Sequence, residues 1–341
     1  MRVVSGMRPT GRLHLGNLHG ALTKWVELQT TAECFFFVAD WHALTTNYVD
    51  PSNIQSDQRE MVVDWLSAGL DPKRCTIFVQ SQVPAHAELF LLLGMLTPNP
   101  WLERVPSFKE QQQELQDREL NTYGFLGYPL LQTADIILYR ATHVPVGQDQ
   151  LAHLELTREV ARRFNHLYGP LFPEPEPLLT KVPKVWGTDG RKMSKSYNNS
   201  IWMGEAESST RQKIMGATTD PARKRRQDPG EPTKCGIYYL HQLYSSAERI
   251  QEVEAGCRSA GIGCVDCKKW LLEKLLPAQA ELESRRADVL REPDVIDDVL
   301  AEGSARAREV ADATMEEARR AMKLIGPVPS SPESPLVKEL E

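Results

Sequence analysis

Over its first 190 residues or so, the chain alternates short apolar runs with longer stretches in which apolar residues recur every three or four positions. The short runs are β-branched or aromatic and predict parallel strands buried on both faces. These runs are 3–4, 34–39 and 76–80. The longer stretches predict amphipathic helices at 15–29, 54–69 and 85–96. Strand and helix in this order are typical of a doubly wound, parallel α/β fold, the Rossmann-like architecture.

After residue 200 the strand runs stop and only helical spacing continues. We expect helices at 206–215, 238–255, 268–290 and 295–323. The predicted organisation is an α/β domain at 1–199, an all-helical domain at 200–326 and a disordered, proline-rich tail at 327–341. The polar stretch 101–121 interrupts the first domain as an inserted helical arm, either a solvated hairpin or a subunit contact.

Composition narrows the function classes. With 341 residues and 41% hydrophobic positions, two domains can each bury a core. The longest purely apolar run is six residues, against about 20 for a membrane span, so no membrane protein is expected. A start without a signal-peptide pattern predicts a cytoplasmic protein with reduced cysteines. The net charge of −6 argues against coating nucleic acid by bulk charge, although the run 223–226 (RKRR) offers either a local basic face or ordinary solvated surface.

Two motifs carry candidate chemistry. The first, GRLHLGN at 11–17, follows the first strand and opens the first helix, where Gly16 permits close backbone approach and His14 can donate to a phosphate. The second is KMSKS at 192–196, a loop whose Lys192 and Lys195 can neutralise triphosphate charge. Each is common enough alone, and their coincidence in one α/β chain points to nucleotide chemistry. The first motif is not G-x-G-x-x-G, which disfavours a dinucleotide redox enzyme.

Together these motifs resemble the HIGH and KMSKS signatures of class I aminoacyl-tRNA synthetases, with HLGN as the first. Four further segments are similar to tryptophanyl-tRNA synthetases in particular. They are SGMRPTG at 5–11, DWHALT at 40–45, YPLLQTADI at 128–136 and VPVGQDQ at 144–150. The resemblance covers about residues 2 to 325. It implies that ATP activates L-tryptophan to an adenylate, with loss of diphosphate, and that the tryptophanyl group passes to the 3′ end of tRNA(Trp).

The resemblance also implies the residues of the nucleotide site. His14, Lys192 and Lys195 would stabilise the phosphates in the transition state together with Mg²⁺. The ATP contacts would be Arg8, Pro9, Thr10, Gly16, Asn17, Gly147, Gln148, Asp149, Val185, Lys192, Met193, Ser194, Lys195 and Ser196. Arg8 stands where many relatives have glutamine.

For the amino acid, the resemblance assigns the indole N–H to Asp135, since a buried carboxylate needs a donor. The alternative is that Asp135 pairs with Arg140. Tyr128 and Gln150 would hold the ammonium group. The slot for the indole would be lined by Val4, His42, Gln132, Val144 and Val146, with Gln132 replacing the methionine of some relatives.

Four cysteines of the second half, Cys235, Cys257, Cys264 and Cys267, have the spacing C-x21-C-x6-C-x2-C. In a reducing compartment such a set predicts a metal site, and a four-thiolate Zn²⁺ site is the general interpretation. The spacing is also similar, with one residue fewer in the long gap, to a [4Fe-4S] site in the anticodon-binding domain of some bacterial tryptophanyl-tRNA synthetases. Free thiols are the third alternative.

Two rival functions are a small-molecule nucleotidyltransferase and a non-catalytic paralogue that binds tRNA or senses tryptophan. The first leaves the helical half without a task, and the second is disfavoured because His14 and both lysines are present. The resemblance further implies a homodimer, and a helical domain that serves tRNA binding while adenylate formation needs only the α/β half.

Overall fold

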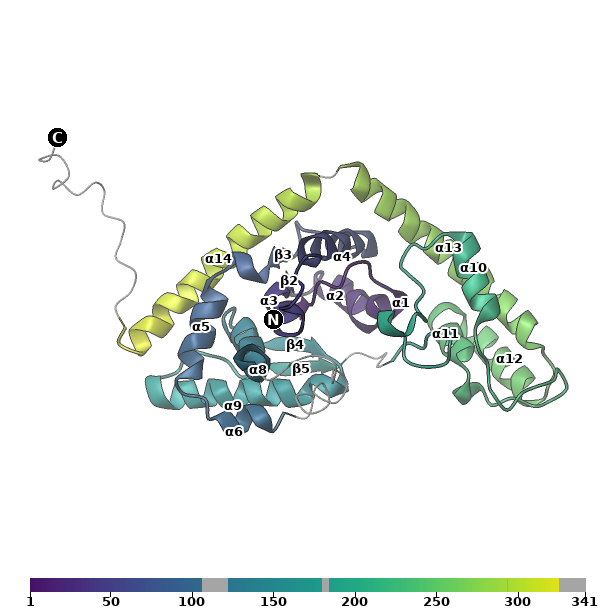
Figure 1. Cartoon of the computed structure of the whole chain (residues 1–341), viewed down its shortest axis with the longest axis horizontal. Coiled ribbons are helices and arrows are strands. Elements are labelled where there is room, and N and C mark those ends of the chain that lie inside the picture. The colour runs from purple at the N-terminus through teal and green to yellow at the C-terminus, as the bar shows by residue number, and fades with distance from the viewer. Residues whose placement is uncertain (106–121, 180–183, 293, 325–341) are drawn as a thin grey trace, which may run out of the picture.

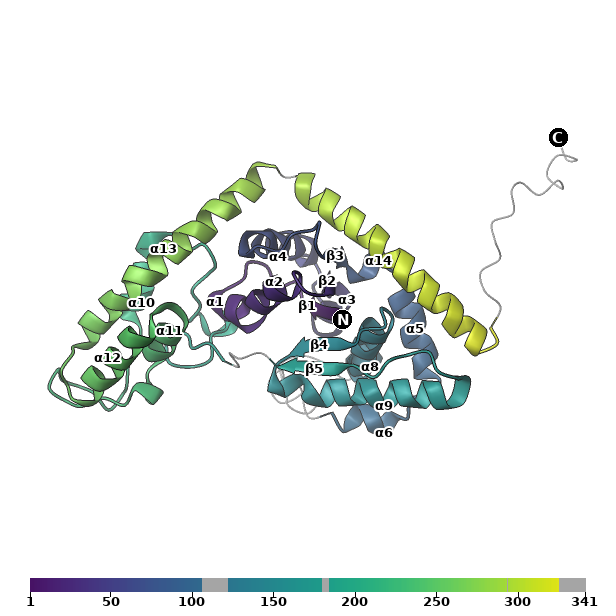
Figure 2. The ribbon, with the colours of Figure 1, turned by 180° about the vertical axis from the view of Figure 1, so that it is seen from behind.

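The computed structural model describes residues 1–105, 122–179, 184–292 and 294–324, with only the backbone of Asp149. Figures 1 and 2 show the arrangement from opposite sides. Most of the arm expected at 101–121, and the whole tail expected at 327–341, lie outside the described residues. Within the described ranges, no helix is long and apolar enough to cross a membrane.

The centre of the molecule is a five-stranded sheet in the order β3-β2-β1-β4-β5, and all four strand pairs are parallel. The strands are β1 (Arg2–Met7), β2 (Glu33–Val38), β3 (Thr76–Val79), β4 (His143–Val146) and β5 (Glu176–Leu179). The doubly wound fold and the first three strands are thereby confirmed. Sequence patterning missed β4 and β5, because each has only four residues and contains a proline, which lacks the N–H that a ladder needs.

Helices cover both faces of the sheet. In the first half they are α1 (Leu15–Asn17), the π-helical η1 (Leu18–Leu22), α2 (Thr23–Leu28), α3 (Asp40–Asn47), α4 (Ile54–Ala68), α5 (Ala85–Gly94), α6 (Asn99–Glu103), α8 (Tyr123–Ile137) and α9 (Leu151–Tyr168). Alternate residues of β2 divide the core: Phe35 packs with α5, α8 and α9, whereas Phe36 packs with α2 and α4. Burial on both faces explains why β2 is continuously apolar.

Two expected helices are divided. The stretch 15–29 forms α1, η1 and α2 in succession, with a π-helical turn directly after the HLGN motif; such turns are frequent at functional sites. The stretch 238–255 forms α11 (Gly236–Tyr244) and α12 (Ala247–Arg258), because the Ser246 side chain caps a new helix by accepting from the N–H of Arg249. Gly69 ends α4 in the left-handed conformation, with φ of 106°, as predicted.

The second half is helical, as expected, and comprises α10 (Glu207–Gly216), α11, α12, α13 (Cys264–Arg291) and α14 (Asp294–Ala321). The long helices α13 and α14 meet at an apex, and α14 returns along the sheet (Figure 1). At Gly303 an added Cβ would lie 1.7 Å from the carbonyl oxygen of Ile77, so α14 packs directly on β3. The last helix of the region 200–326 is therefore part of the sheet's covering, and the domain boundary near residue 199 stays a prediction.

Candidate active site and four-cysteine cluster

The candidate active site is a pocket of about 410 Å³ at the carboxyl ends of β1 and β4. In the strand order, the chain runs from β1 outward to β2 and β3, then crosses to β4 on the other side of β1. This is the topological switch point, where open α/β sheets bind ligands. The pocket is lined by Val4, Ser5 and Gly6 of β1, by residues of β4 and by one face of α8. Its volume lies in the range of small-molecule sites.

All eight residues that the resemblance assigns to tryptophan line this pocket, and so does Arg8. Sequence reasoning missed other lining residues, among them Phe37, Ile136 and His153. Phe37 is the last residue but one of β2, and its ring would collide with a Cβ at position 6, at 2.4 Å. Gly6 therefore allows the aromatic ring to lie across β1 and form one wall of the pocket.

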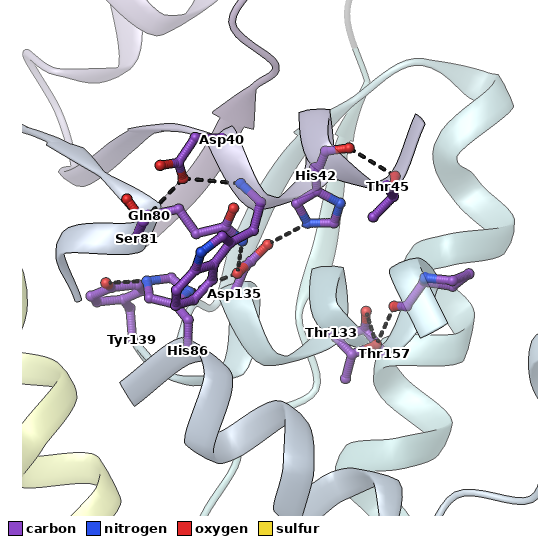
Figure 3. A network of polar contacts seen from close by, with 12 residues as sticks. Asp40, His42, Thr45, Gln80, Ser81, His86, Thr133, Asp135, Tyr139 and Thr157 are labelled. Atoms are coloured by element: carbon purple, nitrogen blue, oxygen red, sulfur yellow. Dashed lines mark hydrogen bonds and ion pairs between the residues drawn. The ribbon is translucent and has the colours of Figure 1, made fainter. Parts of the chain in front are cut away.

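Asp135, on α8, is buried at the base of the pocket and accepts three hydrogen bonds (Figure 3). Its Oδ2 accepts from Nε2 of His42 at 2.7 Å. Its Oδ1 accepts from Nε2 of Gln80 at 2.7 Å and from Nδ1 of His86 at 2.6 Å. Nε2 of His86 in turn contacts the Tyr139 hydroxyl at 2.7 Å. These contacts fix the carboxylate in one orientation.

The same contacts set the charge of Asp135. Burial alone would raise its pKa, but the hydrogen bonds from His42 and His86 outweigh burial and hold the pKa at about 2. Arg140 does not pair with it, since its guanidinium contacts Glu317 at 2.6 Å. Gln80 and His86 were missed from the sequence. Their one signal was position, because Gln80 directly follows β3 and His86 lies in the first turn of the next helix, α5, near the edge of the sheet where functional side chains of parallel sheets gather.

His14 caps the helix that begins at Leu15. Its Nδ1 accepts the N–H of Asn17 at 3.3 Å, while Oδ1 of Asn17 accepts the N–H of His14 at 3.1 Å. A Cβ at Gly16 would lie 2.8 Å from the imidazole, so the glycine makes room for the ring. Because Nδ1 is an acceptor here, the neutral ring carries its proton on Nε2.

Burial, followed by the charge of Lys195, lowers the pKa of His14 to about 4. The ring is therefore uncharged near pH 7, and His14 offers a neutral N–H donor. A neighbouring cation disfavours the imidazolium, so removing Lys195 must raise the pKa of His14.

We expect an NMR pH titration of the His14 ring carbons to give a midpoint near 4 in the parent protein. In Lys195→Ala the midpoint should move upward, toward the ordinary value of about 6.5. Lys24→Ala, which removes a lysine paired with Glu27 on the surface, is the matched control and should leave the midpoint in place. An unchanged midpoint in Lys195→Ala would show that the two side chains do not sense each other.

The KMSKS loop lies against the loop that follows β1. The ammonium of Lys195 donates to the backbone carbonyl of Thr10 and, at 3.1 Å, to its hydroxyl. Asn199 holds the loop from within: its Oδ1 accepts the N–H of Ser194 at 2.8 Å, and its Nδ2 donates to the carbonyl of Lys192 at 3.1 Å. The Lys192 side chain is exposed.

The other residues assigned to ATP fall into two groups. Val185 accepts the N–H of Met193 at 2.8 Å, and Met193 packs beside Leu15 at the start of α1. Gly147 and Gln148 follow β4, next to the lining residue Val146. The side chain of Asp149 lies outside the described residues. Since Arg8 lines the pocket and Thr10 touches Lys195, residues 8–10 join the pocket to the KMSKS loop.

A second, separate cavity lies among the helices of the second half. All four predicted ligands, Cys235, Cys257, Cys264 and Cys267, line it, together with Arg223 and apolar side chains. Their thiols are free of disulfides. Across the described residues, however, no three histidine, cysteine, aspartate or glutamate side chains are arranged to hold a metal ion as they stand.

The basic run 223–226 is not simply a solvated face. Arg223 turns inward, where its guanidinium donates to the carbonyl of Ile262 at 2.5 Å and approaches the Cys257 sulfur at 3.8 Å. The N–H groups of Lys224 and Arg225 are held by Asp228. Arg223 therefore anchors the run at the cysteine cavity.

Comparison with known proteins agrees with the fold and the pocket. The family model "tRNA synthetases class I (W and Y)" matches residues 1–276. A tryptophan–tRNA ligase of Thermotoga maritima is 53% identical and one of Ralstonia nicotianae is 45% identical, with 95% of this chain covered in both and 100% and 98% of the relatives.

The crystal structure of tryptophanyl-tRNA synthetase from Campylobacter jejuni, complexed with ADP and tryptophan, has a TM-score of 0.83 at 31% identity. It covers 95% of this chain and 100% of its own. These similarities over nearly the full chain exclude the nucleotidyltransferase and non-catalytic alternatives. The chain belongs to the class I aminoacyl-tRNA synthetases, in the family that activates tryptophan with ATP and transfers it to tRNA.

Proposed function

We propose that the pocket around Asp135 binds L-tryptophan and that the His14 and KMSKS loops beside it bind ATP. The observation that carries this proposal is the position of residues 8–10, which line the pocket at one end and contact Lys195 at the other. The tryptophan carboxylate and the α-phosphate would then meet between the two clusters. Tryptophan-dependent exchange of diphosphate into ATP tests both clusters at once.

Asp135 selects the amino acid through its remaining acceptor capacity. An ionised carboxylate offers about four acceptor positions, and His42, Gln80 and His86 occupy three. The fourth is left for the indole N–H. An amino acid without that donor would leave a buried charge incompletely paired, which costs free energy. Tyr128 and Gln150 hold the ammonium group, and Val4, Val144 and Val146 contact the indole ring.

Catalysis consists of alignment and charge stabilisation. The tryptophan carboxylate attacks the α-phosphorus in line, and diphosphate leaves. His14 donates from Nε2 as a neutral group, while Lys192 and Lys195 neutralise charge on the departing phosphates. Mg²⁺, when bound with ATP, supplies further positive charge. Lys195 must exchange its contact with Thr10 for phosphate oxygens.

The four cysteines form a metal site in this proposal. The fit rests on the donor set, because four soft sulfur ligands line one cavity together with apolar side chains and a few polar ones, among them Asp220 and Arg223. The group we favour is a [4Fe-4S] cluster, and Zn²⁺ is the alternative. Cys235 would hold it from the N-cap of α11, Cys257 from α12, and Cys264 and Cys267 from the first turn of α13. The group would tie these three helices together.

We expect Cys264→Ser to lose the bound metal and to lower tRNA aminoacylation more than diphosphate exchange, because Cys264 lines a cavity that is separate from the candidate active site. Iron, sulfide and zinc are measured in protein purified without oxygen, and both activities are assayed. Cys34→Ser is the matched control, since that buried thiol lies in β2 and contacts the carbonyl of Ala32.

Iron with sulfide in the parent protein would support the cluster, and one zinc per chain would support the alternative. Parent protein that contains neither iron nor zinc would contradict a metal site. Equal loss of both activities in a folded Cys264→Ser protein would overturn the division of tasks.

The helical half serves tRNA(Trp) in this proposal, with the exposed members of the run 223–226 on its surface. Of these, Arg226 has a side chain that is 75% exposed and contacts Asp266 only at 3.8 Å. We give Arg223 a structural role and no role in tRNA binding, because it contacts Ile262 and Cys257. In this proposal the enzyme acts in the cytoplasm, where ATP and tRNA are available.

We also propose a homodimer whose contact surface includes α5 and the start of α8. Leu91, Met95 and Tyr123 are 55%, 71% and 68% exposed there, beside an apolar groove lined by Phe90 and Leu131. Adjacent exposed apolar side chains mark protein interfaces.

Light scattering at micromolar concentration should give twice the chain mass. Met95→Glu should shift the mass toward one chain, because it places a charge in the apolar contact. Val265→Glu, at an apolar residue 53% exposed on α13, is the control and should leave the dimer intact. A single-chain mass for the parent protein would contradict the proposal.

A further inference from the structure

One buried carboxylate outside the pocket contacts both halves of the chain. Asp64 lies on α4 and is fully buried. Its Oδ2 accepts the backbone N–H of Leu13 at 2.5 Å, the residue immediately before His14. Its Oδ1 accepts from the guanidinium of Arg286, on α13. Arg286 also contacts Glu60, one turn earlier on α4.

Helix α13 reaches the His14 loop by a second route. Gln279 accepts the N–H of Gly204 at 3.0 Å and donates to the carbonyl of Trp202 at 2.8 Å. The intervening residue, Met203, donates its N–H to the carbonyl of Leu13 at 2.9 Å. Both backbone groups of Leu13 are therefore held by partners that contact α13.

The charge on Asp64 depends on Arg286. Burial raises the pKa of Asp64 to about 6, although Arg286 is the first of several groups that lower it. Without the guanidinium the carboxyl would bind a proton more readily and become a weaker acceptor for the Leu13 N–H. A charge-assisted bond to the backbone beside His14 would be lost, although neither Asp64 nor Arg286 lines the pocket.

We propose that Asp64 and Arg286 are positioning residues for activation, and that α13 through them holds the His14 loop in the geometry that receives ATP. This inference rests on the proposed role of His14. It replaces our expectation that adenylate formation needs only the α/β half, because Arg286 belongs to the helical half.

The test compares diphosphate exchange in Arg286→Gln, Asp64→Asn and the double variant with tryptophan binding measured by equilibrium dialysis. A misplacement of the His14 loop by a fraction of an ångström should lower kcat for exchange by about 10- to 100-fold. Tryptophan affinity should change less than twofold, because the pocket is not contacted. The double variant should be no worse than Arg286→Gln, since both changes interrupt one path.

Two controls separate positioning from folding. Arg291→Gln, on the same helix and paired with Asp288 at the surface, should have no effect. Arg286→Lys, which keeps the charge, should recover part of kcat. If Arg286→Gln does not fold, kcat for exchange and tryptophan affinity are compared between Arg286→Lys and the parent. A lower kcat with unchanged affinity supports the positioning role, and parental kcat contradicts it.

Equal losses of tryptophan affinity and kcat, or parental kcat in folded Arg286→Gln and Asp64→Asn, would overturn the inference. His14→Ala distinguishes its failure from that of the proposed function. If His14→Ala exchanges diphosphate as well as the parent, the role of His14 is wrong. If His14→Ala is impaired while Arg286→Gln is not, only the positioning role is wrong.

Discussion

Replacing Asp135 with asparagine should lower kcat/KM for tryptophan by roughly 100-fold or more, which corresponds to about 3 kcal/mol from hydrogen bonds to a buried charge. The charged carboxylate now accepts from His42, Gln80 and His86. An amide has one acceptor oxygen and one donor nitrogen in the same places. Its N–H₂ would face at least one of those donors, so both the fixed orientation and the acceptor for indole would be lost.

Discrimination against other amino acids should fall together with affinity. Diphosphate exchange with tryptophan, phenylalanine and tyrosine gives kcat/KM for each, and thermal unfolding reports whether the variant is folded. Glu317→Gln is the matched control, because it removes a surface carboxylate paired with Arg140, the partner first considered for Asp135. Parental activity with tryptophan and continued rejection of phenylalanine in Asp135→Asn would refute the assignment.

Lys195→Ala should reduce kcat for activation by about 100- to 1,000-fold, the usual cost of removing one donor from a developing negative charge. Tryptophan affinity should stay near the parental value, because Lys195 contacts Thr10 and not the residues that line the pocket. An interaction made only in the transition state changes kcat and kcat/KM together. Exchange kinetics and equilibrium dialysis with labelled tryptophan separate these quantities.

Lys24→Ala, at a surface lysine paired with Glu27, controls for the loss of one positive charge. Unchanged kcat with a raised KM for tryptophan in Lys195→Ala would mean that the lysine serves amino-acid binding. A Lys195→Arg variant keeps the charge and should recover part of kcat, but not all, since a planar guanidinium cannot reproduce the geometry of a compact ammonium.

Periodicity predicted the fold where burial is continuous. The run 34–39 reads as a strand because both its faces pack into core clusters. Periodicity did not predict elements whose limits depend on proline, on helix capping or on a π-helical turn. Pro145 and Pro177 make β4 and β5 unlike strands in sequence, because proline is rare within a sheet. Strand β4 pairs with β1 and β5, and β5 pairs with β4. Ser246 divides a continuous helical pattern by capping, and no spacing rule locates the π-helical turn after Asn17.

The residues of the candidate site also fall into those that the sequence predicts and those that it does not. Motif residues could be named because their spacing in the chain is distinctive, and the eight residues that the resemblance assigns to tryptophan binding line one pocket. The residues that support them were missed, because Gln80, His86 and Arg286 act through contacts between elements distant in sequence. A sequence shows which buried carboxylates need donors, but only the packing of helices shows which donors reach them.

The most direct test of the whole account is tryptophan-dependent exchange of labelled diphosphate into ATP by the purified chain, with tyrosine and phenylalanine as competing amino acids. Tyrosine matters because the matching family includes synthetases for both W and Y. The account predicts exchange that requires Mg²⁺ and tryptophan, is at background with tyrosine or phenylalanine, and is lost in Asp135→Asn and Lys195→Ala. Exchange supported equally by tyrosine, or unaffected by both substitutions, would contradict it.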